Sequence, residues 1–289
     1  MRVGIVGVGI MGGAMATNLA RGGHVVTGYD VDSSNTAALA DGVLIAADSP
    51  GDVATSSDVV ILSLPSAAAL SDVAVEIAKS GSRNVIVLET GTLALDTKFA
   101  ARDRLGESGI ELMDTPLSGT GLQARDAKLV VYASGSESGY MRCIPVFEAI
   151  GRSSYYLGEF GNGTRMKFIA NLLVAIHNLA TAEAHVLGIA SGIDPAVVQR
   201  AIEDGVGSSK IFEIRGPMMV ADDYPPAARL DIILKDATLI TEYARSVGAP
   251  TPLLDLALSV YQDAAEAGFG DLDAAALCRH LERVAGLAR

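Results

Sequence analysis

The sequence is poor in the residues that build redox and metal sites. It holds two cysteines, Cys143 and Cys278, which lie far apart and without C-x-x-C spacing. We expect both to be reduced, structural thiols of a cytoplasmic protein. Of the four histidines, His177 and His185 share a probable helix, but a separation of eight residues is not metal-ligand spacing. No metal site is therefore expected.

Positive charge is scarce as well. The 22 lysines and arginines are outnumbered by 34 aspartates and glutamates, and no basic cluster is present. This argues against nucleic acid or an anionic membrane as a partner, although a few local cations can still hold a small anionic substrate. No uninterrupted apolar run reaches membrane-spanning length, and the first strand signal starts almost at Met1. We therefore expect neither a membrane span nor a signal peptide.

The chain does have a 49% apolar composition, enough for one large or two ordinary domains, and a glycine-rich start. The apolar run Arg2 to Val6 predicts a buried strand. Gly7, Gly9 and Gly12 follow with G-x-G-x-x-G spacing, and a helix-forming stretch runs from there to Arg21. In such a motif the first glycine permits a tight turn and the second lets a pyrophosphate approach the backbone. The third lets the helix pack closely on the strand.

Asp30 closes the next apolar run, about 20 residues after the glycines, where dinucleotide sites carry an acidic residue. Its carboxylate can accept hydrogen bonds from an adenosine ribose. The free N–H groups and the positive dipole end of the first helix would face the phosphates. The weaker alternative is a glycine-rich turn in some other α/β protein.

Strand and helix signals alternate up to about residue 160, which predicts βαβ units and a doubly wound, Rossmann-type parallel sheet. Ligands on such sheets bind at the carboxyl ends of strands, which directs attention to Pro65, Thr92 and the segment after Met113. A polar, glycine-rich loop, SGTGLQARDAK, is a candidate binding loop, with a plain surface turn as the alternative. The expected strands are 2–6, 25–29, 43–46, 59–64, 84–89, 112–118, 129–134 and 153–157, and the expected helices after the first are 67–79, 95–107 and 138–150.

Residues 161–289 carry only helical signals, so we predict two domains, 1–160 and 161–289. The first helix of the second domain runs almost without breakers to Ala190. Because its apolar residues occupy nearly all sides, we expect it to be buried all round, as an interdomain spine or a dimer core. Asp194 and either Asp271 or Asp273 are suitable N-caps for later helices. Those helices are expected at 195–203, 232–247, 252–267 and 272–287.

Four separated motifs resemble those of the β-hydroxyacid dehydrogenases. In order they are GVGIMGGAMATNL (7–19), DTPLSG (114–119), GNGTRMKFIAN (161–171) and LKDATL (234–239). The family includes 3-hydroxyisobutyrate dehydrogenase, tartronate semialdehyde reductase and, more distantly, 6-phosphogluconate dehydrogenase, and the resemblance covers nearly the whole chain. It implies an NAD(P)-dependent oxidoreductase that interconverts a small 3-hydroxyacid and its semialdehyde or keto form by hydride transfer.

The resemblance also implies roles for single residues. Lys167 would be the catalytic acid/base, and Asn171 would orient both Lys167 and the substrate. Ser118 and Gly119 would hold the substrate carboxylate, with Thr120 beside its head group. The implied cofactor-binding residues are Gly7, Gly9, Ile10, Met11, Gly12, Asp30, Leu64, Pro65, Thr92 and Lys235, the last closing over the cofactor from the helical domain.

Spacing alone says less about the lysine. Lys167 and Asn171 are four residues apart and so share one face of the predicted helix. Burial in that apolar helix would disfavour the charged amine and suit it to proton transfer. Without the motif around it, a lysine that merely extends its ammonium to solvent is an equally good interpretation.

The sequence departs from the family at the substrate and cofactor loops. Thr120 stands where a glycine is common, and Gly91-Thr92 replaces the usual Ser-Thr pair. Val31 and Asp32 stand where NADP-preferring relatives carry an arginine, and the carboxylate of Asp30 repels a 2′-phosphate. We therefore expect NAD as the cofactor, with NADP possible.

Two other functions remain open. An imine reductase on the same scaffold usually lacks the motif lysine, so Lys167 argues against it. A catalytically silent dinucleotide-binding protein need not keep Lys167, Asn171 and Ser118 together. The apolar helices of the second half further predict a homodimer or homotetramer, as the family resemblance does.

Overall fold

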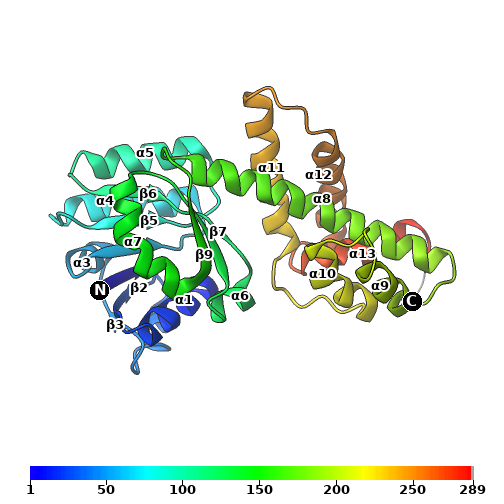
Figure 1. Cartoon of the computed structure of the whole chain (residues 1–289), viewed down its shortest axis with the longest axis horizontal. Coiled ribbons are helices and arrows are strands. Elements are labelled where there is room, and N and C mark those ends of the chain that lie inside the picture. The colour runs from blue at the N-terminus through cyan, green and yellow to red at the C-terminus, as the bar shows by residue number, and fades with distance from the viewer. Residues whose placement is uncertain (288–289) are drawn as a thin grey trace. The chain divides into compact units, whose positions relative to one another are not determined.

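The computed structural model describes residues 1–287 of the chain. It divides into two compact units, Met1–Lys167 and Phe168–Arg289, which we call the N-terminal unit and the helical unit. The division falls inside the long helix α8 (Asn162–Ala190), which begins in the N-terminal unit (Figure 1). Each unit is described by itself.

The N-terminal unit is built on a six-stranded parallel sheet in the order β3-β2-β1-β4-β5-β6. The order reverses between β1 and β4, so the carboxyl ends of these two strands form the switch point where such sheets bind ligands. This confirms the predicted doubly wound fold. The strands are β1 (Arg2–Val6), β2 (Val25–Tyr29), β3 (Ile45–Ala46), β4 (Val59–Leu62), β5 (Ile86–Glu89) and β6 (Glu111–Asp114).

A second, three-stranded sheet follows, in the order β7-β8-β9, with β7 antiparallel and β9 parallel to β8. The expected single strand 112–118 is therefore wrong, because it is divided between two sheets. The break falls at Pro116, whose nitrogen has no hydrogen to donate to a ladder. Asp114 still joins the two sheets through an antiparallel bridge to Ser134. The strands are β7 (Leu117–Ser118), β8 (Leu129–Ala133) and β9 (Gly151–Tyr156).

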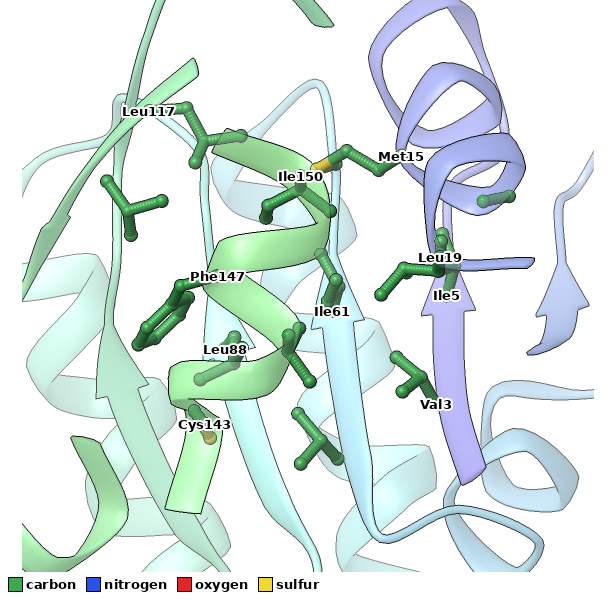
Figure 2. Close-up of a cluster of buried hydrophobic side chains, with 14 of the residues drawn as sticks. Val3, Ile5, Met15, Leu19, Ile61, Leu88, Leu117, Cys143, Phe147 and Ile150 are labelled. Carbon is green, nitrogen blue, oxygen red and sulfur yellow. The ribbon is translucent and has the colours of Figure 1, made fainter. Parts of the chain in front are cut away.

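Helices cover both faces of the parallel sheet, because alternate strand residues point to opposite faces. On one face, Ile5 and Ile61 pack with Met15 of α1 and with Phe147 of α7 (Figure 2). The other face, including Leu62, packs against α3, α4 and α5. Each fully buried side chain of this size stabilises the fold by about 1.5–3 kcal/mol. The helices are α1 (Ile10–Arg21), α2 (Ser33–Ala37), α3 (Pro50–Thr55), α4 (Ala67–Lys79), α5 (Leu95–Gly106), α6 (Gly121–Arg125) and α7 (Glu137–Ile150).

The segment expected to be a glycine-rich loop contains the short helix α6. Gln123 starts it, because its Oε1 accepts hydrogen bonds from the backbone N–H of Thr120 at 2.6 Å and from its hydroxyl at 2.8 Å. The helix is held against α1 by the buried amide of Asn18, which donates to the carbonyl of Ala124 at 2.6 Å. The segment is therefore more than a plain surface turn.

The regular elements of the helical unit are all helices within its described residues, as expected, and its core centres on the buried Tyr261 and Leu254. One helix was not expected: α10, whose Gly216-Pro217 pair reads in the sequence as a breaker. Its glycine is needed for packing, since a Cβ there would lie 1.9 Å from Oε1 of Gln199. The elements are α9 (Pro195–Glu203), α10 (Lys210–Ala221), α11 (Leu230–Ser246), α12 (Pro252–Ala264), a π-helix (Ala265–Phe269), a 3₁₀ helix (Ala274–Ala276) and α13 (Leu277–Val284).

Two of the predicted N-cap residues accept hydrogen bonds from backbone N–H groups at helix starts in this unit. Asp194 accepts a hydrogen bond from the N–H of Ala196 at 2.7 Å, and Asp273 accepts one from Ala275 at 3.0 Å. Asp271, the alternative to Asp273, instead forms an ion pair with Arg229 at 2.8 Å. Asp273 is therefore the cap.

Helix α8 is not buried all round within one chain, so its expected burial depends on a second copy, and the dimer core stays a prediction. The side chains of Ile169, Leu173 and Leu187 are 57%, 48% and 70% exposed. A helix with apolar residues on all sides is predicted to be buried, but the pattern does not say whether the same chain or a second copy packs against those residues. By length and composition, α8 could also cross a membrane, contrary to the expectation that no segment would qualify. The core helices of soluble proteins pass the same test.

Candidate active site

The glycine-rich turn after β1 has the shape that its spacing predicts. Gly7 has φ +89°, and a Cβ there would lie 2.3 Å from the carbonyl oxygen of Ser63. A Cβ on Gly12 would lie 1.9 Å from the carbonyl oxygen of Gly7. The turn and the close contact between helix and strand therefore both require glycine.

Gly9 differs from its two neighbours, because a Cβ there would meet no atom within 4 Å. It is also the N-cap of α1 and provides no side-chain cap for the N–H groups of the first turn. Open space beside uncapped amides at a positive dipole end suits a pyrophosphate. Ile10 is exposed and Met11 half-buried at this edge. The turn therefore fits the phosphates of a dinucleotide, and the contacts themselves stay a prediction.

Asp30 follows β2 and is tied to the same turn. One carboxylate oxygen accepts a hydrogen bond from the N–H of Val8 at 2.7 Å, and the other accepts one from Asp32 at 2.9 Å. Each oxygen retains a second lone pair for a ribose hydroxyl. Asp30 therefore shapes the turn as well as being the expected ribose contact, a double role that the sequence did not indicate.

The ends of β4 and β5 supply the next predicted contacts. Leu64, just after β4, and Thr92, after β5, are half-buried, whereas Pro65 is exposed. A Cβ on Gly91 would lie 2.8 Å from Oε1 of the buried Glu89. This explains why glycine stands where the family usually has serine: the missing side chain makes room for that carboxylate.

The predicted substrate loop lies beside the glycine-rich turn. A Cβ on Gly121 would lie 2.8 Å from Cγ2 of Ile10, so the start of α6 contacts the edge of the turn. Gly119 has φ +144°, in the region that favours glycine. The hydroxyl of Thr120 is held by Gln123, as described above, and so serves the helix start. The half-buried Ser118 stays the predicted carboxylate ligand.

The predicted catalytic residues both lie on α8. Lys167 is half-buried, not fully buried as the sequence argument supposed, whereas Asn171 is buried. The amide nitrogen of Asn171 donates to Oδ2 of Asp236 at 2.7 Å, and the other oxygen of Asp236 pairs with Lys235 at 3.1 Å. Because the amide nitrogen must face a carboxylate, the amide oxygen of Asn171 points away from Asp236.

Sequence reasoning selected Lys235 from the late motif and missed its neighbour. Asp236 is the buried residue that fixes the orientation of Asn171. The signal was present, since an aspartate adjoining a lysine within an apolar helix is costly unless it has a partner. What the sequence could not supply was the identity of that partner.

The comparisons with known proteins agree with this geometry. Residues 2–158 match the family model described as the NAD binding domain of 6-phosphogluconate dehydrogenase. Residues 161–281 match the model described as NAD-binding of NADP-dependent 3-hydroxyisobutyrate dehydrogenase. The chain belongs to the β-hydroxyacid dehydrogenase family. It is an NAD(P)-dependent dehydrogenase or reductase that acts on a CH–OH group.

Individual members of the family are similar over nearly their whole length. L-threonate dehydrogenase of Escherichia coli strain K12 is 31% identical, covering 96% of this chain and 93% of its own. The crystal structure of 3-hydroxyisobutyrate dehydrogenase from Salmonella typhimurium has a TM-score of 0.89 and 30% identity, with 97% and 99% coverage. The 3-hydroxyisobutyrate dehydrogenase of Mycobacterium tuberculosis with L-serine has a TM-score of 0.88 and 25% identity, with 97% and 98% coverage.

This member of the family also contains a buried ionic cluster, which sequence reasoning missed entirely. Lys98 of α5 lies between Glu89 and Asp114, and all three side chains are fully buried. Burial raises the pKa of Glu89, and the attraction of Lys98 only partly offsets this. Burial lowers the pKa of Lys98, but the two carboxylates outweigh it and the net shift is upward. The ammonium therefore stays charged.

Proposed function

We propose that the protein is an NAD-preferring oxidoreductase that interconverts a small 3-hydroxyacid and its semialdehyde or keto form, with Lys167 as acid/base. The observation that carries this is the placement of the motif lysine. Lys167 begins the second turn of α8, in the same unit as the glycine-rich turn and the segments that end at Thr92 and Ser118. These segments lie at or follow the carboxyl edge of one parallel sheet, where ligands bind.

The chemistry explains why a lysine is needed. Oxidation of an alcohol removes a hydride from carbon, which a bound nicotinamide takes up, and a proton from oxygen, which needs a base. A neutral Lys167 amine would take that proton, and in reduction its ammonium would return it to the forming alkoxide. The four matched motifs contain no histidine, so the lysine is the best-placed candidate.

The substrate is proposed to be a small hydroxyacid whose carboxylate lies against Ser118 and Gly119. The printed names of similar proteins suggest what to test first: L-threonate and 3-hydroxyisobutyrate. A panel of small hydroxyacids with NAD and with NADP, followed by NADH or NADPH absorbance, decides among the functions. Turnover of a hydroxyacid supports the proposal. Turnover of cyclic imines alone would favour an imine reductase, and dinucleotide binding without any turnover would favour a silent binding protein.

The preference for NAD rests on charge. Asp30 closes β2 beside the glycine-rich turn, and Val31 and Asp32 after it offer no cation for a 2′-phosphate. We propose that the carboxylate accepts hydrogen bonds from the ribose hydroxyls of NAD and repels the phosphate of NADP.

We further propose a homodimer or homotetramer formed through the helical half. The exposed side chains of Ile169, Leu173 and Leu187 lie along α8, where a second copy could cover them. Light scattering at micromolar concentration should give a mass of at least two chains, and a monomer mass would contradict the proposal. Cys143 and Cys278 are both buried thiols in the part of the chain that the structure describes, which fits the proposed cytoplasmic location.

A further inference from the structure

We propose that Lys98 is a positioning residue whose ammonium fixes the segments carrying Thr92, Ser118 and Lys167 relative to one another. The inference rests on the proposed role of Lys167 and adds the structural support behind it. It concerns the N-terminal unit alone, since each residue involved lies between Glu89 and Lys167.

The ammonium of Lys98 donates two hydrogen bonds and forms a close ion pair with a third oxygen. It lies 2.8 Å from the carbonyl oxygen of Gly91, 2.8 Å from Oδ1 of Asp114 and 2.5 Å from Oε2 of Glu89. Glu89 holds the same turn from its other side, since its Oε1 accepts from the N–H of Gly91 at 2.8 Å. Both polar backbone groups of Gly91, the residue before Thr92, are therefore held by this cluster.

Asp114 passes this constraint to the start of α8. Its carboxylate accepts from the N–H of Thr164 at 2.7 Å and from the Thr164 hydroxyl at 2.7 Å. Ser134 adds to the cluster, donating to Asp114 at 3.2 Å and accepting from the N–H of Gly163 at 2.9 Å. These side chains satisfy two of the N–H groups that a helix start leaves without intrahelical partners. Lys167 stands three residues after Thr164, about one helical turn.

Asp114 also begins the segment that ends at Ser118. Its own N–H and carbonyl oxygen pair with Ser134 at 3.0 and 2.8 Å, and the N–H of Thr115 donates to the carbonyl of Glu89 at 2.9 Å. The ammonium of Lys98 therefore contacts the segment after β5 directly. Through Asp114 it is also linked to the predicted substrate loop and to the first turn of α8. Asp114 itself belongs to a family motif, whereas Lys98 lies outside all four.

Stability is a poor explanation for this charge. A buried ion pair often contributes no more than a well-packed apolar group of similar size, because desolvation offsets much of the attraction. What such a group does provide is direction, because its two hydrogen bonds and its ion pair with Glu89 define where the contacted segments lie. Catalytic geometry is sensitive to such placement, and a shift of about 1 Å can lower a rate about 100-fold.

The sharpest test uses Thr164, because its hydroxyl can be removed with little change of shape. Thr164→Val removes the 2.7 Å bond to Asp114, and Thr164→Ser keeps it. We expect kcat to fall roughly tenfold in the valine variant and to return to within about twofold of wild type in the serine variant. NADH affinity, measured by fluorescence, should change little. The isotope effect on kcat with substrate deuterated at the carbinol carbon should rise, because hydride transfer becomes more rate-limiting.

Lys98→Met tests the ammonium of Lys98 itself, and Arg215→Met is its matched control. Arg215 forms a buried pair with Asp273 in the helical unit, 3.3 Å apart, with side chains 6% and 2% exposed. Both variants should lower the melting temperature, but only Lys98→Met should lower kcat, by about 100-fold. Hydrogen exchange of the peptide 158–166 should also speed up in Lys98→Met and not in the control.

Each outcome decides the matter. If Thr164→Val keeps kcat within twofold of wild type with an unchanged isotope effect, the inference is overturned, even if Lys98→Met fails to fold. The same holds if the control loses as much kcat as Lys98→Met. If Lys167→Ala is nearly inactive while the cluster variants turn over normally, only the inference fails. If Lys167→Ala itself retains the wild-type rate, the proposed acid/base role of Lys167 fails, and hydrogen exchange still tests the link to α8.

Discussion

The two ends of the proposed site are built in opposite ways. The glycine-rich turn is shaped by missing side chains, since Cβ atoms on Gly7 and Gly12 would lie 2.3 and 1.9 Å from carbonyl oxygens. The lysine end is shaped by side chains that are present, with Lys98 and Asp114 joining the segment after β5, a loop and a helix start. The first end is local in sequence, whereas the second joins residues up to 75 positions apart, from Glu89 to Thr164. Variants at the two ends should therefore fail in different ways.

The largest effect is expected at the lysine end. Lys167→Ala should lower kcat by about 10²–10⁴, the usual contribution of a positioned acid/base group. Lys167→Arg should restore little, because a guanidinium does not release its proton near neutral pH. NAD affinity, measured by titration, should persist in both variants, since the glycine-rich turn is untouched. Loss of cofactor binding together with activity would mean that the two ends are not separable.

Asn171→Ala should have a smaller effect on the same end. It removes orientation but leaves the proton carrier, so we expect kcat/KM to fall roughly 10- to 100-fold. The variant also leaves Asp236 without the amide that donates to it at 2.7 Å. Asp236→Asn is the matched control, because it keeps an oxygen that can accept from Asn171. A loss in Asn171→Ala as large as that in Lys167→Ala would contradict this ranking.

At the glycine end, Gly12→Ala should act on folding and cofactor binding. The added methyl group is forced against the Gly7 carbonyl, and overpacking of this kind costs about 1–3 kcal/mol. Thermal unfolding with and without NAD measures both consequences. Gly9→Ala is the control, because a Cβ at that position has open space in the protein. It should keep wild-type stability and weaken NAD binding only. Equal loss of stability in both variants would refute the distinction between the two glycines.

The smallest expected effect concerns the choice of cofactor. Asp30→Asn keeps an oxygen for the N–H of Val8 and removes the charge, so it preserves the turn better than alanine would. We expect the NAD-to-NADP ratio of kcat/KM to fall about tenfold, which corresponds to about 1.4 kcal/mol. Asp30→Ala should shift the ratio similarly and also loosen the turn. A wild-type preference for NADP would refute the proposed preference for NAD. An unchanged ratio in Asp30→Asn would show that the charge of Asp30 does not select the cofactor.

The contrast between the two ends also explains what the sequence could predict. Periodicity and glycine spacing depend on neighbouring residues, so the parallel sheet, the turn after β1 and most helices were predicted. Helix α10 was missed because Gly216 and Pro217 both disfavour a helix interior, and the sequence does not show that Gln199 approaches Gly216 too closely for a Cβ. The exposure of Ile169 on α8 within one chain is compatible with the predicted dimer core, since an apolar pattern does not say which chain covers it.

The same limit applies within the site. Family motifs indicated Lys167, Asn171 and Ser118, but no local pattern marks Lys98, since its partners Glu89 and Asp114 lie 9 and 16 residues away on separate strands. The sequence also did not indicate that the carboxylate of Asp30 accepts a hydrogen bond from the N–H of Val8. Polar groups that act across elements become visible only when the fold brings them together.

The central claim is that Lys167 exchanges the proton that accompanies hydride transfer. The most direct test is single-turnover reduction of the cofactor by wild type and Lys167→Ala, with enzyme in excess over a substrate that the panel has identified. The account predicts a rate of NADH formation about 10²–10⁴ lower in the variant, with NAD still bound at the concentration used. Hydride transfer within a few-fold of the wild-type rate would show that Lys167 is not the acid/base.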